Sequence, residues 1–189
     1  MGKRQSTTRF KLLPYRPIAK RWRWPALLMI PAGVGFYYVT ATEGRHTPQV
    51  ALLALAPTVV GAVIFIYTIL AARAHVSCHS NRIVVHTPFY PIAFSYQRLA
   101  TIRSVEFRTL YPPENQKDAR WRFYKDLWGR TVPTISLRGY PMALWWMKLW
   151  LHPFLFHPKE TGLVLPVEEW MTMVRRIETL QTQWREGRR

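Results

Sequence analysis

This sequence has few cysteine and acidic residues. Its 189 residues include a single cysteine, Cys78, so an internal disulfide is excluded, which agrees with a reducing compartment. Ten acidic residues stand against 27 lysines and arginines, and the net charge is +17. A positive excess of this size favours nucleic acid or an anionic membrane as the partner.

Patterns of catalytic chemistry are also missing. The sequence has no Gly-x-Ser-x-Gly elbow, the motif typical of hydrolases, and no Gly-rich loop before a helix, the motif that binds phosphates. His75 and His79 would share one face of a strand and Cys78 the other, and His152 and His157 complete no zinc spacing. We therefore expect no catalytic residue, no metal and no cofactor, and a protein that is not an enzyme.

Charge is absent from two long apolar segments. Residues 47–72 are 26 uncharged residues, and residues 24–42 are 19. About 20 apolar residues cross a hydrocarbon core of roughly 30 Å, so the pair predicts a transmembrane helical hairpin over 24–72. A cleaved signal peptide is the competing interpretation of the first segment, but Ala41-Thr42 is a weak cleavage site. Without ionisable groups in the apolar cores, we expect no transport path or proton relay there.

Positive charge flanks the hairpin on both sides. Residues 1–23 carry eight Lys and Arg and no acid, and residues 73–189 have a net charge of +9, while the turn at residues 43–46 is neutral. Because Lys and Arg collect on the cytoplasmic side, we expect a multi-pass protein of the cell (inner) membrane with both termini cytoplasmic. The residues predicted at the membrane interface are Arg21, Trp22, Arg23, Trp24 and Arg73.

Small residues predict how the two segments pack. Ala32, Gly33 and Gly35 in the first and Gly61 in the second lack side-chain bulk, which lets helices approach closely in lipid. The alternative interpretation is that these small-residue faces pack against helices of other subunits. Residues 1–23 are expected to form a basic N-terminal arm, because Pro14 and Pro17 oppose a long helix.

Residues 73–189 predict a small antiparallel β domain closed by a helix. Short runs rich in β-branched and aromatic residues, with polar residues between, predict strands near 75–79, 83–86, 92–97, 105–107 and 134–138. Pro166, followed by two glutamates, predicts the start of a C-terminal amphipathic helix. Its apolar stripe is expected on Val167, Trp170, Met171, Val174, Ile177 and Trp184, with Leu180 beside it.

This order of elements resembles the bacterial PH-like membrane proteins. Residues 75–86 (His-Val-Ser-Cys-His-Ser-Asn-Arg-Ile-Val-Val-His) look like the first hairpin of that family. Residues 94–107 are similar to its strand, short turn, Ile-x-x-Val and next strand, and residues 165–170 (Leu-Pro-Val-Glu-Glu-Trp) lead into the closing helix. In that family two transmembrane helices precede a cytoplasmic PH-like domain. The resemblance implies a membrane α+β fold, with a transmembrane hairpin followed by a small antiparallel β PH-like domain.

Two segments exceed the family pattern, as insertions at about 110–131 and 140–158. The first is polar and expected to be a long loop. The second is too short to cross a bilayer and too aromatic for water, so a strand, a core helix and a membrane-lying helix stay open. Aromatic residues and arginine anchor interfaces. The candidate contacts with a partner or lipid are Trp121, Arg122, Trp128, Trp145, Trp146 and Trp150.

These observations lead to two hypotheses on function. The first is a non-catalytic, membrane-anchored PH-like protein that serves as an accessory or assembly subunit of a larger membrane protein complex. The alternative is a free-standing membrane-surface module that binds anionic lipid headgroups without specificity. The Arg-, Trp- and Tyr-rich run 120–130 is compatible with stacked bases. Membrane attachment makes nucleic acid the less economical partner.

Overall fold

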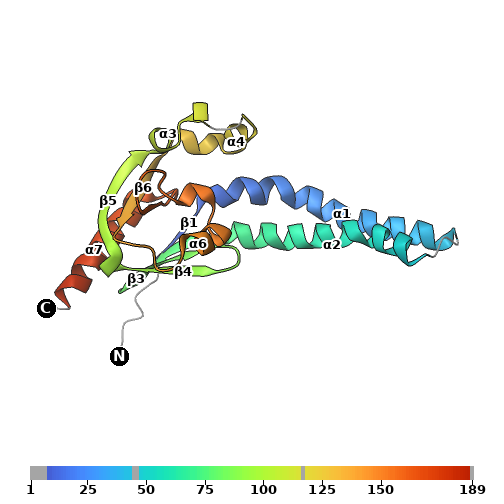
Figure 1. Ribbon diagram of the computed structural model, residues 1–189, viewed down its shortest axis with the longest axis horizontal. Helices are drawn as coiled ribbons and strands as arrows, with labels where there is room; N and C mark the ends of the chain where they lie inside the picture. Colours follow the sequence, from blue (N-terminus) through green and yellow to red (C-terminus); the bar gives the residue numbers. More distant parts are fainter. Residues whose placement is uncertain (1–7, 44–46, 116–117, 188–189) are drawn as a thin grey trace. The chain divides into compact units, whose positions relative to one another are not determined.

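The computed structural model describes residues 8–43, 47–115 and 118–187, with only the backbone for residues 115 and 119–121. The chain forms two compact units (Figure 1). The first, called here the helical unit, is Arg16–Ala72. The second, the β unit, combines the residues before Arg16 with those from Arg73 onward. The β unit is therefore built from two pieces of chain that the helical unit separates.

The helical unit is an antiparallel pair of helices, α1 (Arg16–Thr42) and α2 (Pro48–Ala72). Both are long and apolar enough to cross a membrane. Most of their large apolar side chains point outward, as Leu28, Tyr38 and Leu52 do. A helix that is apolar all round belongs in a protein core or a lipid environment. The predicted hairpin of two apolar helices is confirmed.

Small residues at seven-residue spacing form the contact between α1 and α2. Gly33 lies against Ala54 and Thr58, and a Cβ added to Gly61 would stand 2.8 Å from Met29 Cβ. The spacing repeats as Ala26 and Gly33 on α1 and as Ala54, Gly61 and Thr68 on α2, all buried. A seven-residue repeat keeps one seam of each helix facing its partner. The Thr58 hydroxyl adds a hydrogen bond across the seam, donated to Ile30 O at 3.3 Å.

Helix α1 begins earlier than expected, because residues 16–23 are helical rather than part of a basic arm. Pro17 stands in the first turn, where its missing N–H has no partner to lose. Pro25 and Pro31 also lie inside the helix, which continues through both. The expectation that prolines exclude a long helix here is wrong for residues 16–23.

The first sheet of the β unit contains four antiparallel strands in chain order. They are β1 (Thr8–Lys11), β2 (His75–Cys78), β3 (Arg82–His86) and β4 (Pro91–Ser95). Strand β1 precedes the hairpin and pairs with β2, which follows it, so Lys11 is opposite His75. Residues 8–11 are thus a strand and not an arm. The hairpin is inserted between two neighbouring strands of one sheet.

The second sheet contains β5 (Leu99–Glu106), β6 (Thr131–Leu137) and β7 (Gly162–Val164), all antiparallel. A short 3-10 turn at Tyr96–Arg98 carries the chain from the first sheet to the second. Alternate residues of β2, β3 and β4 form the core face of the first sheet: Val76, Cys78, Ile83, Val85, Ile92 and Phe94 are all buried. The predicted antiparallel β architecture is confirmed.

The closing helix α7 (Trp170–Glu186) packs on β6 and also contacts β2, as expected for an amphipathic helix that covers a sheet. It begins at Trp170 rather than at Pro166. Its buried side is Met173, Ile177 and Leu180, while Met171 is 56% exposed. Val167 forms a β-bridge with Leu12 instead. The predicted stripe is wrong at Val167, which precedes the helix, and at Met171, because the buried face is the one that carries Met173, Ile177 and Leu180 at four- and three-residue spacing.

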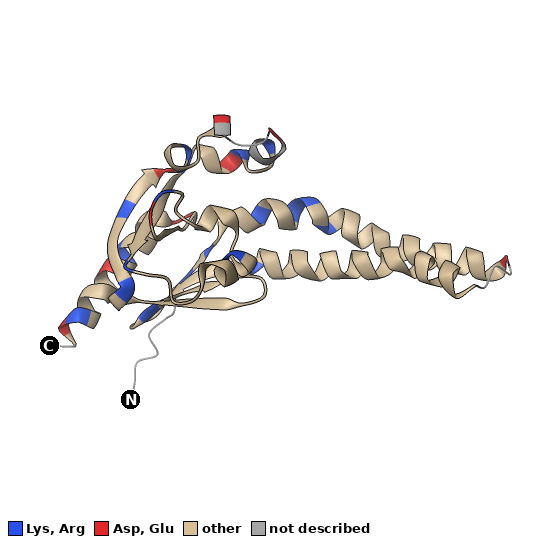
Figure 2. Ribbon diagram, viewed as in Figure 1, with Lys and Arg blue, Asp and Glu red and all other residues tan. Residues whose placement is uncertain are grey.

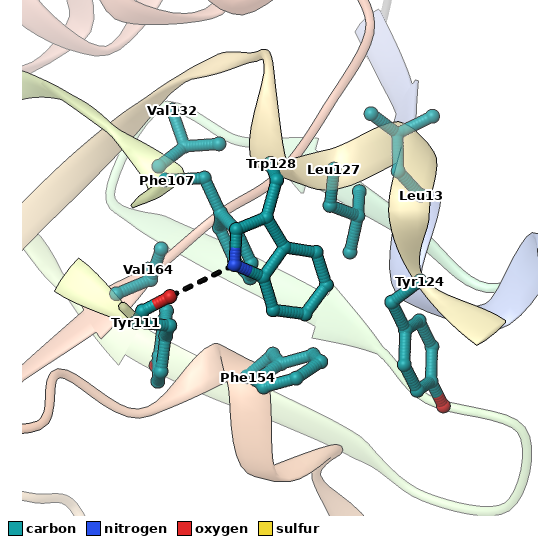
Figure 3. Close-up of a cluster of buried hydrophobic side chains, with 9 residues drawn as sticks. All are labelled: Leu13, Phe107, Tyr111, Tyr124, Leu127, Trp128, Val132, Phe154 and Val164. Atoms are coloured by element: carbon teal, nitrogen blue, oxygen red, sulfur yellow. Dashed lines mark hydrogen bonds between the residues drawn. The ribbon is translucent and has the colours of Figure 1, made fainter. Parts of the chain in front are cut away.

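The segment 110–131 is not a plain loop. It contains short helices, and several of its side chains belong to a core cluster. The short helices are α3 (Phe107–Leu110), α4 (Asp118–Phe123) and α5 (Lys125–Trp128). Trp128 is buried among Phe107, Tyr111 and Phe154, and its Nε1–H donates to Tyr111 O at 2.9 Å (Figure 3). Trp128 was expected at a partner or lipid surface, and that expectation is wrong. Its ring is part of the hydrophobic core cluster of the β unit.

Candidate interaction surface

The other tryptophan-rich segment forms α6 (Leu144–Trp150), a short helix that shows aromatic side chains to the outside. Met147 is fully buried and holds the helix to the β unit. The opposite side carries Trp145, which is 69% exposed, and Leu149, which is 64% exposed. Of the three interpretations left open by the sequence, the strand is wrong, because the segment contains a helix. A helix with one buried and one exposed side also differs from a fully buried core helix.

The aromatic rings of α6, exposed at Trp145 and Trp146 and half-buried at Trp150, continue onto the connection between β3 and β4. Trp150 contacts Phe89 and Tyr90, with ring centroids 6.1 and 6.2 Å away, and Trp146 at 5.7 Å. Trp145 follows 5.4 Å from Trp146. We call this surface the aromatic patch. It consists of Phe89, Tyr90, Trp145, Trp146, Leu149 and Trp150.

Sequence reasoning missed two members of the aromatic patch, Phe89 and Tyr90. They lie between Pro88 and Pro91 in the connection from β3 to β4, where no site residue was predicted. The Thr87 hydroxyl closes this turn by donating to Tyr90 O at 2.6 Å and accepting from Tyr90 N at 3.0 Å. The turn leaves Phe89 60% exposed. The signal in the sequence is a pair of aromatic residues between two prolines, in a connection too short to bury them.

The remaining predicted site residues are dispersed. Trp22, Arg23 and Trp24 are exposed on consecutive positions of α1, and Arg73 is exposed directly after α2. Arg21 lies on the same stretch of α1. Arg23 and Trp24 line a pocket of about 260 Å³ together with Leu27 and Phe65. Its lining combines one guanidinium with apolar and aromatic side chains.

Two further predicted contacts lie in α4. Arg122 is exposed, whereas the side chain of Trp121 lies outside the described part of the structure. Of the five predicted partner or lipid contacts whose side chains the structure describes, it brings together Trp145, Trp146 and Trp150. The sequence placed all six residues in one class of surface contacts, but Trp128 faces the core.

Positive charge is concentrated at one end of the helical unit. Figure 2 shows Lys and Arg in the first turns of α1 and none through the rest of α1 or through α2. These residues are Arg16, Lys20, Arg21 and Arg23. Among the described residues from 16 to 72, the only acidic side chain is Glu43, which directly follows α1. The charged turns extend α1 beyond its apolar part.

Three histidines gather around one serine on the polar face of the first sheet. The Ser77 hydroxyl lies 3.2 Å from His79 Nε2 and 3.1 Å from His86 Nε2. His75 stacks on His86 with centroids 4.3 Å apart. Sequence reasoning included His75 and His79 but missed His86, which the hairpin register places opposite His75. Among the described residues, no group of three or more His, Cys, Asp or Glu is arranged to hold a metal ion.

The histidine cluster predicts a loss of stability in acid. Burial, followed by the positive charges of His75, His79 and Arg9, lowers the pKa of His86 below its ordinary 6.5. The unfolded chain then binds a proton more readily than the folded one, so stability rises with pH through this range. We expect the thermal midpoint to fall as the pH drops below about 6.5. The His86→Gln variant should show a smaller fall, and an unchanged acid slope would contradict this.

The buried thiol and phenol and the remaining histidines are shielded from solvent or hydrogen-bonded within the fold. Burial raises the pKa of the Cys78 thiol to about 12, so the nucleophilic thiolate is not formed near neutral pH. Burial also raises the pKa of Tyr96, whose hydroxyl donates to His79 O at 2.7 Å. His152 and His157 accept backbone N–H bonds within their own turns. Each of these groups has a structural partner or is shielded.

Comparison with known proteins adds no assignment. No protein-family model matches the chain, and no curated protein or solved structure matches it either. The fold class is therefore established by the chain's own elements: a hairpin of two apolar helices, two antiparallel sheets and a C-terminal helix.

Proposed function

We propose that this chain is a non-catalytic, membrane-anchored PH-like protein that serves as an accessory or assembly subunit of a larger membrane protein complex. The observation that carries the proposal is a second, unused face on α1. Gly33 packs on α2, but Gly35 lies about half a turn further round, and a Cβ there would meet nothing within 4 Å. Ala32 is exposed on the same outward side. We call this the outer α1 face.

The outer α1 face has the shape that a further helix needs. Leu28 and Val39 flank Ala32 and Gly35 at spacings of four, three and four residues, and all four are exposed. Two large side chains therefore stand on either side of two residues with little or no side chain. In lipid, association depends on close packing, and small residues permit it. Another membrane-spanning helix is the partner that such a face accepts.

The remaining parts of the proposal have their own support. Four strands, then three, then a closing helix agree with the PH-like domain expected from the resemblance, although β1 precedes the hairpin rather than following it. The basic turns of α1 and Arg73 favour a cytoplasmic β unit, since positive residues stay on that side of a membrane. The inert Cys78 and the structural histidines favour a non-catalytic role.

A second candidate is a free-standing membrane-surface module that binds anionic lipid. The net charge of +17 and the exposed tryptophans of α6 favour it. Anionic headgroups attract Lys and Arg near the bilayer surface without needing a specific pocket. This candidate predicts a monomer that needs no other protein.

Mild-detergent purification separates the two candidates. We expect wild-type protein to co-purify with another membrane protein, and Gly35→Leu to reduce that recovery about tenfold, which corresponds to about 1.4 kcal/mol. Val34→Leu is the matched control, because Val34 is also exposed but lies on another side of α1. It should leave recovery unchanged. Isolation of the wild-type protein only as a free monomer would contradict the subunit proposal.

A further inference from the structure

The aromatic patch lies at a defined end of the first sheet. Lys11 is opposite His75, His75 is opposite His86, and His86 is opposite Pro91, so these four residues mark one end of β1, β2, β3 and β4. The connection that carries Phe89 joins β3 to β4 at this same end. The register alone therefore places the aromatic patch at the end of the sheet marked by Lys11 and His75.

The same end is where the chain leaves for the helices and returns from them. After Lys11 the chain continues to Arg16, where α1 begins, and α2 ends at Ala72, three residues before His75. Three residues of chain reach at most about 10 Å. The chain itself therefore links this end of the first sheet to the basic first turns of α1 and, through Arg73, to the end of α2. Both helices are long and apolar enough to span a membrane.

The composition of the aromatic patch suits the surface of a bilayer. Trp and Tyr prefer the headgroup level, where their rings lie in the boundary and their polar groups reach water or phosphate. Residues 140–158 contain no acidic side chain, and Lys148 is exposed on α6 beside Leu149. An anionic headgroup layer therefore meets apolar rings and a cation, without a carboxylate to repel it. A short helix anchored by one buried residue, with apolar side chains outward, is typical of interfacial elements.

We propose that the aromatic patch docks on the surface of the bilayer, with Trp145 and Leu149 inserted among anionic lipid headgroups. The inference rests on the membrane anchoring in the proposed function, but not on the partner subunit. Docking adds a third attachment to the two chain connections and holds the β unit against the membrane in one orientation. The occupant of the aromatic patch is lipid rather than a protein, since the chain connections bring this end of the unit to the bilayer before any partner is bound.

Spin-label accessibility tests the docking on the full chain in nanodiscs that contain phosphatidylcholine and phosphatidylglycerol. One label is attached at Leu149→Cys and the control label at Glu178→Cys, an exposed position on α7. Cys78 is 3% exposed, and wild-type protein treated in parallel checks that it stays unlabelled. Oxygen is enriched in lipid, and a nickel chelate stays in water. We expect the ratio of oxygen to nickel accessibility at residue 149 to exceed that at residue 178 several-fold.

Each other outcome overturns the docking. Nickel accessibility at residue 149 equal to that at residue 178 would mean that the aromatic patch faces water. Shielding from both oxygen and nickel would mean that protein covers it, either a partner or a second copy. A second label at Phe89→Cys should behave like the label at residue 149 and lose its oxygen preference when Trp145→Glu is added. Co-purification that persists while residue 149 faces water would leave the subunit proposal standing and remove only the docking.

Discussion

Replacing Gly61 with leucine is expected to separate α1 from α2 and to destabilise the hairpin by about 1–3 kcal/mol or more. A Cβ at this position would stand 2.8 Å from Met29 Cβ and 2.9 Å from Ala26 O. One of these neighbours is a backbone carbonyl, which a rotamer change cannot move. Far-UV circular dichroism during heating in detergent micelles should show the loss as a lower unfolding midpoint.

Gly35→Leu is the matched control for the hairpin, because the same chemical change there meets open space. Its midpoint should equal that of the wild type or exceed it slightly, since leucine is the better helix former. The pair of variants thus separates the two faces of α1. Gly61→Leu disturbs the fold, while Gly35→Leu keeps the fold and disturbs only the proposed partner. Equal destabilisation by both variants would contradict the packing described for α1 and α2.

Replacing Trp128 with alanine is expected to destabilise the β unit by about 3–5 kcal/mol, the range for removing a large buried aromatic side chain. Its ring is 8% exposed and packs edge-on against Phe107 and Phe154, at centroid distances of 5.3 and 5.7 Å. The loss leaves a cavity between the short helices and the second sheet. Near-UV circular dichroism and the thermal midpoint of the full chain report it.

Two further substitutions divide the effect of Trp128 into its parts. Trp128→Phe keeps most ring contacts but removes the Nε1–H donor from Tyr111 O, so it should lose about 1–3 kcal/mol. Trp145→Ala removes an equally large ring from the surface and should stay within about 0.5 kcal/mol of the wild type. A loss for Trp145→Ala as large as that for Trp128→Ala would mean that α6 belongs to the core.

The hairpin could be predicted because its signal is local. An uncharged run long enough to cross a bilayer needs no knowledge of the rest of the chain. The antiparallel strands after it were found for the same reason, since alternation along β4 already shows which of its residues face inward. Gly33 and Gly61 could be nominated from size alone. Which side of α1 each small residue faces depends on the partner helix, so Gly35 was grouped with Gly33.

Strand β1 could not be predicted, because its partner is distant in the sequence. Thr8–Lys11 has only one inward residue, Phe10, between two cations. Such a short run counts as a strand only when β2 is beside it, and the whole hairpin stands between them. Trp128 was misplaced for a related reason. Its neighbours Lys125, Asp126 and Arg130 are polar, and the aromatic residues that bury it come from α3 and from residue 154.

The insertion of the hairpin between β1 and β2 has a consequence for the order in which the protein is made. The ribosome completes β1 first, and the strand then has no neighbour until both helices have been synthesised. Closing a flexible loop as long as residues 12–74 costs about 4 kcal/mol in chain entropy. A hairpin that has already entered the membrane brings Arg16 and Ala72 side by side and removes most of that cost. Under the proposed membrane anchoring, insertion is the step that permits the β unit to fold, and we expect a chain that fails to insert to leave the edge of β2 unpaired and open to aggregation.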